Sequence, residues 1–147
     1  MTLKVNANGE IVEASRNYGW DGSAWRKLPL VWGYSDRYIE RELNSNADAG
    51  ANTLTFSTVP AGEVWVIEGG TAYNSTSGND QIYWNHAGTG IAIRLRRVNA
   101  PSANEEVRIE SRVILKADDA MQAYFTGCTA GDTIAAYVWG YKMKIAE

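Results

Sequence analysis

The clearest pattern of apolar and polar positions lies near the end of the chain, over residues 133–145. As a strand, this stretch would place two sets of side chains on opposite faces: Tyr137, Trp139, Tyr141 and Met143 on one, and Ile134, Ala136, Val138 and Gly140 on the other. Both sets are apolar, and β-branched and aromatic residues suit a pleated surface. Such a strand must be covered on both sides. We therefore expect either a central strand of a sandwich, or a strand with one face on the core and the other on a partner chain.

Strand-length apolar runs separated by turn residues continue through most of the chain. We predict strands over residues 53–59, 64–73, 81–85, 91–98, 106–115, 120–126 and 133–145. Residues 38–43 fit either a strand or a helical turn, and counting them as a strand gives eight. No stretch has the pattern of an amphipathic helix of useful length. The sequence therefore predicts an all-β protein, a jelly-roll-like antiparallel β-sandwich.

The N-terminal region is predicted to form an arm with a hairpin. Two short apolar runs flank Asn8 and Gly9, a residue pair that favours a tight hairpin turn. A two-stranded hairpin is not stable alone in water, so it must lie on the main domain, a neighbouring subunit or a larger assembly. Residues 44–52 are small and polar, and we expect a loop there. The expected organisation is an arm over residues 1–37 and a β-sandwich domain over residues 38–147.

A tryptophan-rich turn follows the hairpin, with Trp20 and Trp25 on either side of the turn pair Asp21 and Gly22. One interpretation is an aromatic clamp for a sugar ring. The other is a tryptophan hairpin whose rings pack on the body of the protein. We favour the second, because paired tryptophans across a turn pack strongly on each other.

The aromatic composition points to surface contacts. The chain has six Trp and eight Tyr but only two Phe, and Trp and Tyr favour interfaces and ligand platforms. A nucleic-acid binder usually shows a basic patch, whereas this chain has a net charge of −3 and a single cluster, Arg94, Arg96 and Arg97. We expect no nucleic-acid partner. The sequence also predicts neither a secretion leader nor a membrane span.

The chemistry of the sequence favours a non-enzymatic protein without metal or cofactor. His86, the only histidine, is expected in a loop at a strand end, facing solvent or an interface, and no nucleophile is marked beside it. Cys128 excludes an intrachain disulfide because it is the only cysteine. With no basic neighbour to lower its pKa, it is expected to be a small buried residue rather than a reactive thiol.

A short turn motif occurs three times, each time before an apolar strand: Ala61-Gly62-Glu63, Ala117-Asp118-Asp119 and Ala130-Gly131-Asp132. We interpret it as a turn whose acidic side chain accepts hydrogen bonds from local backbone N–H groups. A metal site is the less favoured interpretation, because the spacing of a calcium loop is absent.

Segments 18–30, 59–65, 127–132 and 138–142 resemble segments of virion surface proteins of tailed bacteriophages. The resemblance implies a trimeric β-sandwich exposed on the virion, either as capsid decoration or at a tail fibre or spike. The chain begins with Met1 and has no long shaft repeat, which favours a compact stand-alone virion protein over the end of a long fibre. A capsid decoration protein is the leading expectation. A receptor-binding tip is the alternative in the same setting.

The implied partners are two further copies of the chain and other virion proteins, such as the major capsid protein. The protein would then be made in the host cytoplasm and reside on the virion surface. Expected oligomer or platform contacts are Trp20, Trp25, Trp32, Tyr137, Trp139 and Tyr141. A host glycan could contact Tyr83, Trp84 and His86. A free carbohydrate-binding module is the alternative of another class, and it should show exposed, planar aromatic rings with polar neighbours.

Overall fold

The computed structural model describes residues 30–146 without a gap and, before them, residues 4–5, 11–13, 18–20 and 25–27. Side chains are described for residues 36–144 except Ile91. In this part of the chain, every regular element is a β-strand, from β1 to β13. The all-β prediction is therefore confirmed.

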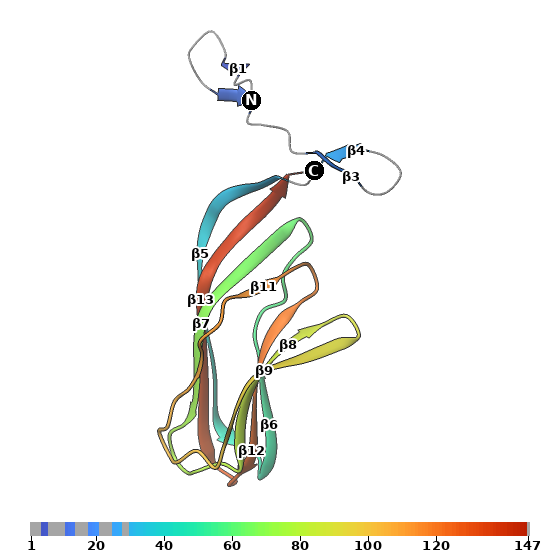
Figure 1. Ribbon diagram of the computed structural model, residues 1–147. Helices are drawn as coiled ribbons and strands as arrows, with labels where there is room; N and C mark the ends of the chain where they lie inside the picture. The colour runs from blue at the N-terminus through green and yellow to red at the C-terminus, as the bar shows by residue number, and fades with distance from the viewer. Residues whose placement is uncertain (1–3, 6–10, 14–17, 21–24, 28–29, 147) are drawn as a thin grey trace.

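Two antiparallel sheets face each other in the main body of the molecule (Figure 1). The first sheet has the order β10-β7-β13-β5, with β11 also paired to β7. Its strands are β5 (Leu30–Ala47), β7 (Glu63–Asn74), β10 (Val107–Ile109), β11 (Val113–Leu115) and β13 (Asp132–Ala146). The second sheet has the order β6-β12-β8-β9. Its strands are β6 (Gly50–Thr55), β8 (Gln81–Gly88), β9 (Ile91–Asn99) and β12 (Ala120–Cys128).

The strand pairing is that of a jelly roll. The first strand of the sandwich, β5, pairs with the last, β13, and β6 pairs with β12. Further in, β7 pairs with β10 and β11, and β8 pairs with β9. This nested pairing is what results when one long antiparallel hairpin is rolled into two sheets. It confirms the predicted jelly-roll-like sandwich, with β10 and β11 together occupying one strand position.

Two sequence-based boundaries differ from the structure. The stretch predicted as one strand over residues 106–115 is divided into β10 and β11. The loop expected over residues 44–52 is reduced to Asp48 and Ala49, because β5 extends to Ala47 and β6 begins at Gly50. Asn52 closes this connection by donating to the Asp48 carbonyl at 2.7 Å and accepting from the Asp48 N–H at 3.1 Å. Most of the small polar residues in 44–52 therefore belong to the ends of β5 and β6 rather than to a loop.

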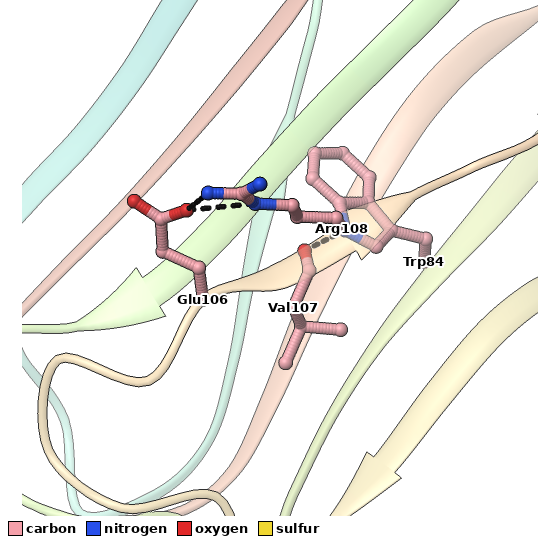
Figure 2. Close-up of polar contacts among 4 residues, drawn as sticks. All are labelled: Trp84, Glu106, Val107 and Arg108. Atoms are coloured by element: carbon pink, nitrogen blue, oxygen red, sulfur yellow. Dashed lines mark hydrogen bonds and ion pairs between the residues drawn. The ribbon is translucent and has the colours of Figure 1, made fainter.

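The hydrophobic core fills the space between the two sheets. The largest apolar side chains with almost no exposed surface are Trp84, Phe125, Ile67, Ile82, Leu115, Met121, Ile134, Val59, Val107 and Val138. Trp84 also ties the sheets together, because its indole N–H donates to the Val107 carbonyl at 2.9 Å (Figure 2). A buried indole N–H without an acceptor would be costly, so this bond fixes the position of β10 against β8.

The three predicted acidic turns share one backbone geometry. The middle residues have positive φ angles, 79° at Gly62, 69° at Asp118 and 89° at Gly131. Asp119 and Asp132 accept hydrogen bonds from the backbone N–H groups of Lys116 and Thr129, at 3.0 and 2.8 Å. The predicted role is therefore confirmed for these two acids. Glu63 instead accepts the Trp65 indole N–H at 2.6 Å.

Two small hairpins precede the sandwich: β1 (Lys4–Val5) with β2 (Ile11–Glu13), and β3 (Tyr18–Trp20) with β4 (Trp25–Lys27). Trp20 pairs directly with Trp25, as expected for a tryptophan hairpin. The turn residues Asn8, Gly9, Asp21 and Gly22 lie outside the described residues. Neither hairpin is hydrogen-bonded into the large sheets within the described part of the chain. The division into an arm and a sandwich stays a prediction, although β5 runs continuously across residue 37.

Candidate functional site

The outer face of the first sheet carries the aromatic row that the sequence singled out. On β13, Ile134 and Val138 are fully buried in the core, whereas Trp139 is 41% exposed. Of the two arrangements expected for this strand, the structure shows the one in which only one face lies on the core. Directly paired residues share a face, and β5 adds Arg37, Ile39, Arg41 and Leu43 beside Tyr141, Trp139, Tyr137 and Ala135. Ile39 is 60% exposed and Leu43 48%. On β11, the exposed Ile114 pairs with Val66, the register partner of Tyr141, so this face has four large exposed apolar side chains.

Trp139 is held on this face by a glycine on the neighbouring strand. Its register partner on β7 is Gly69, and a Cβ at that position would lie 2.6 Å from the ring atom Cε2. The indole ring therefore occupies the space above Gly69. The ladder between β13 and β7 also shifts after Trp139, so Glu68 is left without a register partner on β13. The sequence analysis missed this contact, for which the two adjacent glycines in a strand-like run were the available signal.

Two tyrosines and charged residues surround the exposed apolar residues. Tyr73 and Tyr137 stack with their ring centroids 6.4 Å apart, and the Arg41 guanidinium lies 5.3 Å from the Tyr137 ring. A shallow groove of ≈ 790 Å³ crosses the same face, with Arg37 and Glu106 in its lining. An apolar centre with a charged rim is the usual composition of a protein–protein contact surface.

The outer face of the second sheet has a different character. Tyr83 on β8 and Tyr124 on β12 are register partners whose rings are nearly parallel, at 4° and 4.9 Å between centroids. Arg94 on β9 covers the other side of Tyr83 at 4.4 Å. The Tyr124 hydroxyl donates to Gln122 Oε1 at 2.9 Å, and Gln122 Nε2 donates to Thr55 Oγ1 at 3.2 Å. This face thus combines aromatic, amide, hydroxyl and guanidinium groups.

The expectation that Trp84 contacts a surface ligand is wrong. Its exposed fraction is 0%, because β8 turns Tyr83 outward and Trp84 toward the core. The sequence shows the alternation of these neighbours but not which of the two faces inward.

The expectation that His86 is a loop residue is also wrong, because it lies within β8. Its Nε2 atom is 2.8 Å from Asp119 Oδ2, and its side chain is 20% exposed. This short contact joins an imidazole nitrogen to a carboxylate oxygen, so it is an ion pair when His86 is protonated. Burial would raise the pKa of Asp119, but the Lys116 backbone N–H and His86 together hold that pKa below its ordinary value.

His86 lines a small groove at the end of β8. Its neighbours around this groove of ≈ 400 Å³ include Thr89, Lys116 and Asp118. The close polar contact that the described residues give His86 is the one to Asp119. The arrangement fits an ion pair that anchors the turn before β12 to the end of β8.

Asp132 and Cys128 are structural. Asp132 is 2% exposed and accepts hydrogen bonds from Ser77 Oγ at 2.6 Å and Asn74 Nδ2 at 2.8 Å. These bonds, that from Ser77 first, hold the pKa of Asp132 below its ordinary value. Cys128 is 5% exposed, which confirms the predicted small buried residue, and its burial raises the pKa of the thiol.

The remaining expected contact residues are placed only in part. Trp32 lies on β5 opposite Lys144, and Trp20 and Trp25 lie on the β3–β4 hairpin. The side chains of these three tryptophans are outside the described residues, so their platform role stays a prediction. Tyr141 is half-buried on β13 and pairs with Arg37. Among the described residues, we find no group of three or more His, Cys, Asp or Glu side chains suited to a metal ion. The same residues include no helix that is long and apolar enough to cross a membrane.

Comparison with known proteins gives only distant structural matches. No family model matches the chain, and no curated protein matches it. The Drosophila NLP core, described in connection with pentamer formation and histone binding, is 14% identical, with a TM-score of 0.34, over 75% of this chain and 100% of that one. The Gx strain of infectious bursal disease virus gives 10% identity and a TM-score of 0.37 over 87% of this chain, which spans 40% of the viral chain. A virus-like particle of the extra small virus of the prawn Macrobrachium rosenbergii gives 13% identity and a TM-score of 0.30, over 89% of this chain and 96% of that one. With TM-scores this low, these matches carry no functional argument.

Proposed function

We propose that this chain is a non-enzymatic structural protein of a bacteriophage virion, a capsid decoration protein that forms a homotrimer. The observation that carries the proposal is the row of exposed apolar side chains, Ile39, Leu43 and Trp139, on one sheet face. Soluble monomers rarely expose contiguous apolar patches of large side chains, and such patches mark interaction sites. A second copy of the chain is the occupant that we propose.

The edge of the first sheet supports association between copies. β5 is 18 residues long, and within the described part of the chain it pairs only with β13. A long edge strand is a site of unwanted pairing unless it is covered, and a neighbouring subunit would cover it.

The virion setting rests on the resemblance of segments 18–30, 59–65, 127–132 and 138–142 to phage surface proteins. A tail-fibre or spike tip is the alternative within that setting. Cryo-electron microscopy of native particles would distinguish the two, because a decoration protein studs the shell whereas a tip appears on the tail.

A free carbohydrate-binding module is less well supported. Such a module needs exposed, planar aromatic rings, but the side chain of Trp84 is buried. The facing sides of Tyr83 and Tyr124 are covered by each other. The other side of Tyr83 is covered by Arg94, so Tyr83 offers no open face on which a neutral sugar ring could stack.

The assembly proposal is tested by the oligomeric mass. Light scattering at micromolar concentration should give about three times 16.2 kDa for the full chain. Ile39→Asp should lower the mass to that of a monomer while the circular dichroism spectrum stays β-type. Ile93→Asp is the matched control, because Ile93 is 52% exposed but lies on β9 of the other sheet. A monomeric wild-type chain, or equal effects of the two substitutions, would contradict the proposal.

A further inference from the structure

The second sheet contains basic residues but no acidic ones. Its four strands, β6, β8, β9 and β12, hold three arginines and not a single Asp or Glu. The chain as a whole has 17 acidic and 14 basic residues, so charge is unevenly distributed over the fold. A surface of one sign attracts ligands of the opposite sign.

All three arginines are available on β9, the edge strand of that sheet. Arg94, Arg96 and Arg97 are exposed, and no carboxylate of the described residues forms an ion pair with them. Arg97 pairs with the outward-facing Tyr83. The register then shifts past Leu95, which packs against the core, and Arg94 pairs with Asn85. The bulge thereby allows both Arg94 and Arg97 to face outward.

The stacked rings of Tyr83 and Tyr124 hold the Arg94 side chain in position. Its guanidinium lies 4.4 Å from the centre of the Tyr83 ring, and Tyr124 supports that ring from behind at 4.9 Å. A guanidinium stacked on an aromatic ring keeps its N–H groups free at its edge, where they can bind a carboxylate or sulfate through two hydrogen bonds. Holding the group in place also reduces the entropy lost on binding.

We propose that this face, formed by Arg94, Arg97, Tyr83, Tyr124 and Gln122, binds an acidic polysaccharide. The arginines take the carboxylate or sulfate groups of the sugar chain. Gln122, linked to Thr55 and to the Tyr124 hydroxyl, provides amide and hydroxyl groups for the sugar hydroxyls. The flat face of a sheet suits an extended polymer, which can place successive acidic groups over Arg94 and Arg97. The inference is independent of the proposed trimer, which uses the other sheet.

A nucleic acid fits the same face less well. Proteins that bind single strands stack bases on open aromatic faces. Here one side of Tyr83 is covered by Arg94 and the other by Tyr124. Phosphate contacts alone would have to supply the affinity, and three arginines on a chain of net charge −3 supply few of them.

The test uses the full chain and immobilised polygalacturonate, a polymer with one carboxylate per sugar, at low salt. We expect binding that weakens with salt and is absent on neutral dextran. The double variant R94Q/R97Q should bind about tenfold more weakly or worse, since hydrogen bonds to charged groups are individually strong. Tyr83→Leu should weaken binding without changing net charge, because Arg94 loses its support. R108Q/R112Q is the control, since it removes the same number of charges, and Arg108 and Arg112 are exposed but paired with Glu106 and Glu68, away from the second sheet.

Three outcomes would overturn the inference. Equal losses in R108Q/R112Q and R94Q/R97Q would show unspecific attraction by net charge. Tighter binding of a thymidine oligonucleotide than of polygalacturonate would identify a nucleic-acid partner. If the chain bound neither polygalacturonate nor a sulfated polysaccharide at low salt, the role left for the arginines would be to prevent unwanted pairing of the edge strand β9 with another chain. Circular dichroism of each variant excludes loss of the fold as the cause.

Discussion

The indole ring of Trp139 lies on Gly69 of the neighbouring strand, in space that a Cβ at position 69 would occupy. One aromatic side chain is thereby held on the outer face of the first sheet without being buried in the core. The outer face and the inner face of β13 consequently have separate roles, one in contact with solvent or a partner and the other in the core.

Gly69→Ala should push the Trp139 ring off β7 and destabilise the fold by about 1–3 kcal/mol, the usual cost of overpacking. It should also weaken the trimer, because the displaced ring no longer fits its partner. The free energy of urea unfolding and the oligomeric mass measure the two effects. In a Trp139→Ala background the cost of Gly69→Ala should largely disappear, since the ring that causes the clash is gone. An unchanged cost would mean that Gly69 matters for another reason.

Trp84→Phe should destabilise the sandwich by about 2–4 kcal/mol, because it leaves the buried Val107 carbonyl without its donor and opens a cavity. Trp139→Phe makes the same chemical change at a half-exposed ring and is the control. Its cost to the folding of one chain should stay below about 1 kcal/mol. Urea denaturation of both variants decides this, and equal costs would show that the bond between the two sheets contributes little.

The sequence predicted most of the fold because alternation marks strands whichever way they face. Residues 133–145 were assigned with nearly the right ends, since apolar residues fill both faces of β13. Which face of a strand points toward the core is harder to predict from the sequence. Tyr83 and Trp84 are neighbours on one strand, and only the packing of β8 against β10 decides that Trp84 is the buried one.

The contacts of the site were largely hidden from the sequence because they join distant segments. His86 and Asp119 are 33 positions apart, and nothing local indicates that they meet at 2.8 Å. The same holds for Tyr83 and Tyr124, which become neighbours only through the pairing of β8 with β12. The acidic turns were predictable because their hydrogen bonds are local.

Asp118→Gly should stabilise the protein by about 0.5–1 kcal/mol. Asp118 has a φ angle of 69°, a conformation that costs less for glycine than for other residues. Gly62 and Gly131 occupy the same position in the two matching turns. Gly131→Ala is the opposite change and should destabilise the protein by about 1 kcal/mol or more. Thermal melting of the two variants should therefore shift in opposite directions, and a shift in the same direction would contradict the argument.

Asp132 should make the protein sensitive to acid. Hydrogen bonds, from Ser77 above all, hold the pKa of Asp132 below that of an unfolded aspartate. A lowered folded pKa gives stability that is present above the unfolded pKa of about 3.9 and is lost as pH falls through the folded value. Unfolding free energies measured from neutral pH to about pH 2 should thus fall at the acid end. Asp132→Asn should reduce this loss of unfolding free energy at acid pH. The control Asp36→Asn, at an exposed position, should leave it unchanged. If the wild-type chain and Asp132→Asn lost the same unfolding free energy at acid pH, Asp132 would not be the cause of the acid sensitivity.

A chain that starts at Leu30 should fold as a β-sandwich but attach poorly to its assembly. β5 begins at Leu30, so this truncation removes both N-terminal hairpins and leaves every strand of the two large sheets intact. A two-stranded hairpin cannot stabilise itself, so β1–β2 and β3–β4 gain stability only by docking on another surface. If that surface belongs to a neighbouring subunit or to the shell, the truncated chain should keep its β-type circular dichroism spectrum. It should then bind particles stripped of the native protein much more weakly than the full chain. Undiminished binding would contradict an assembly arm. Failure to fold would instead place Trp20 and Trp25 in the core of their own subunit.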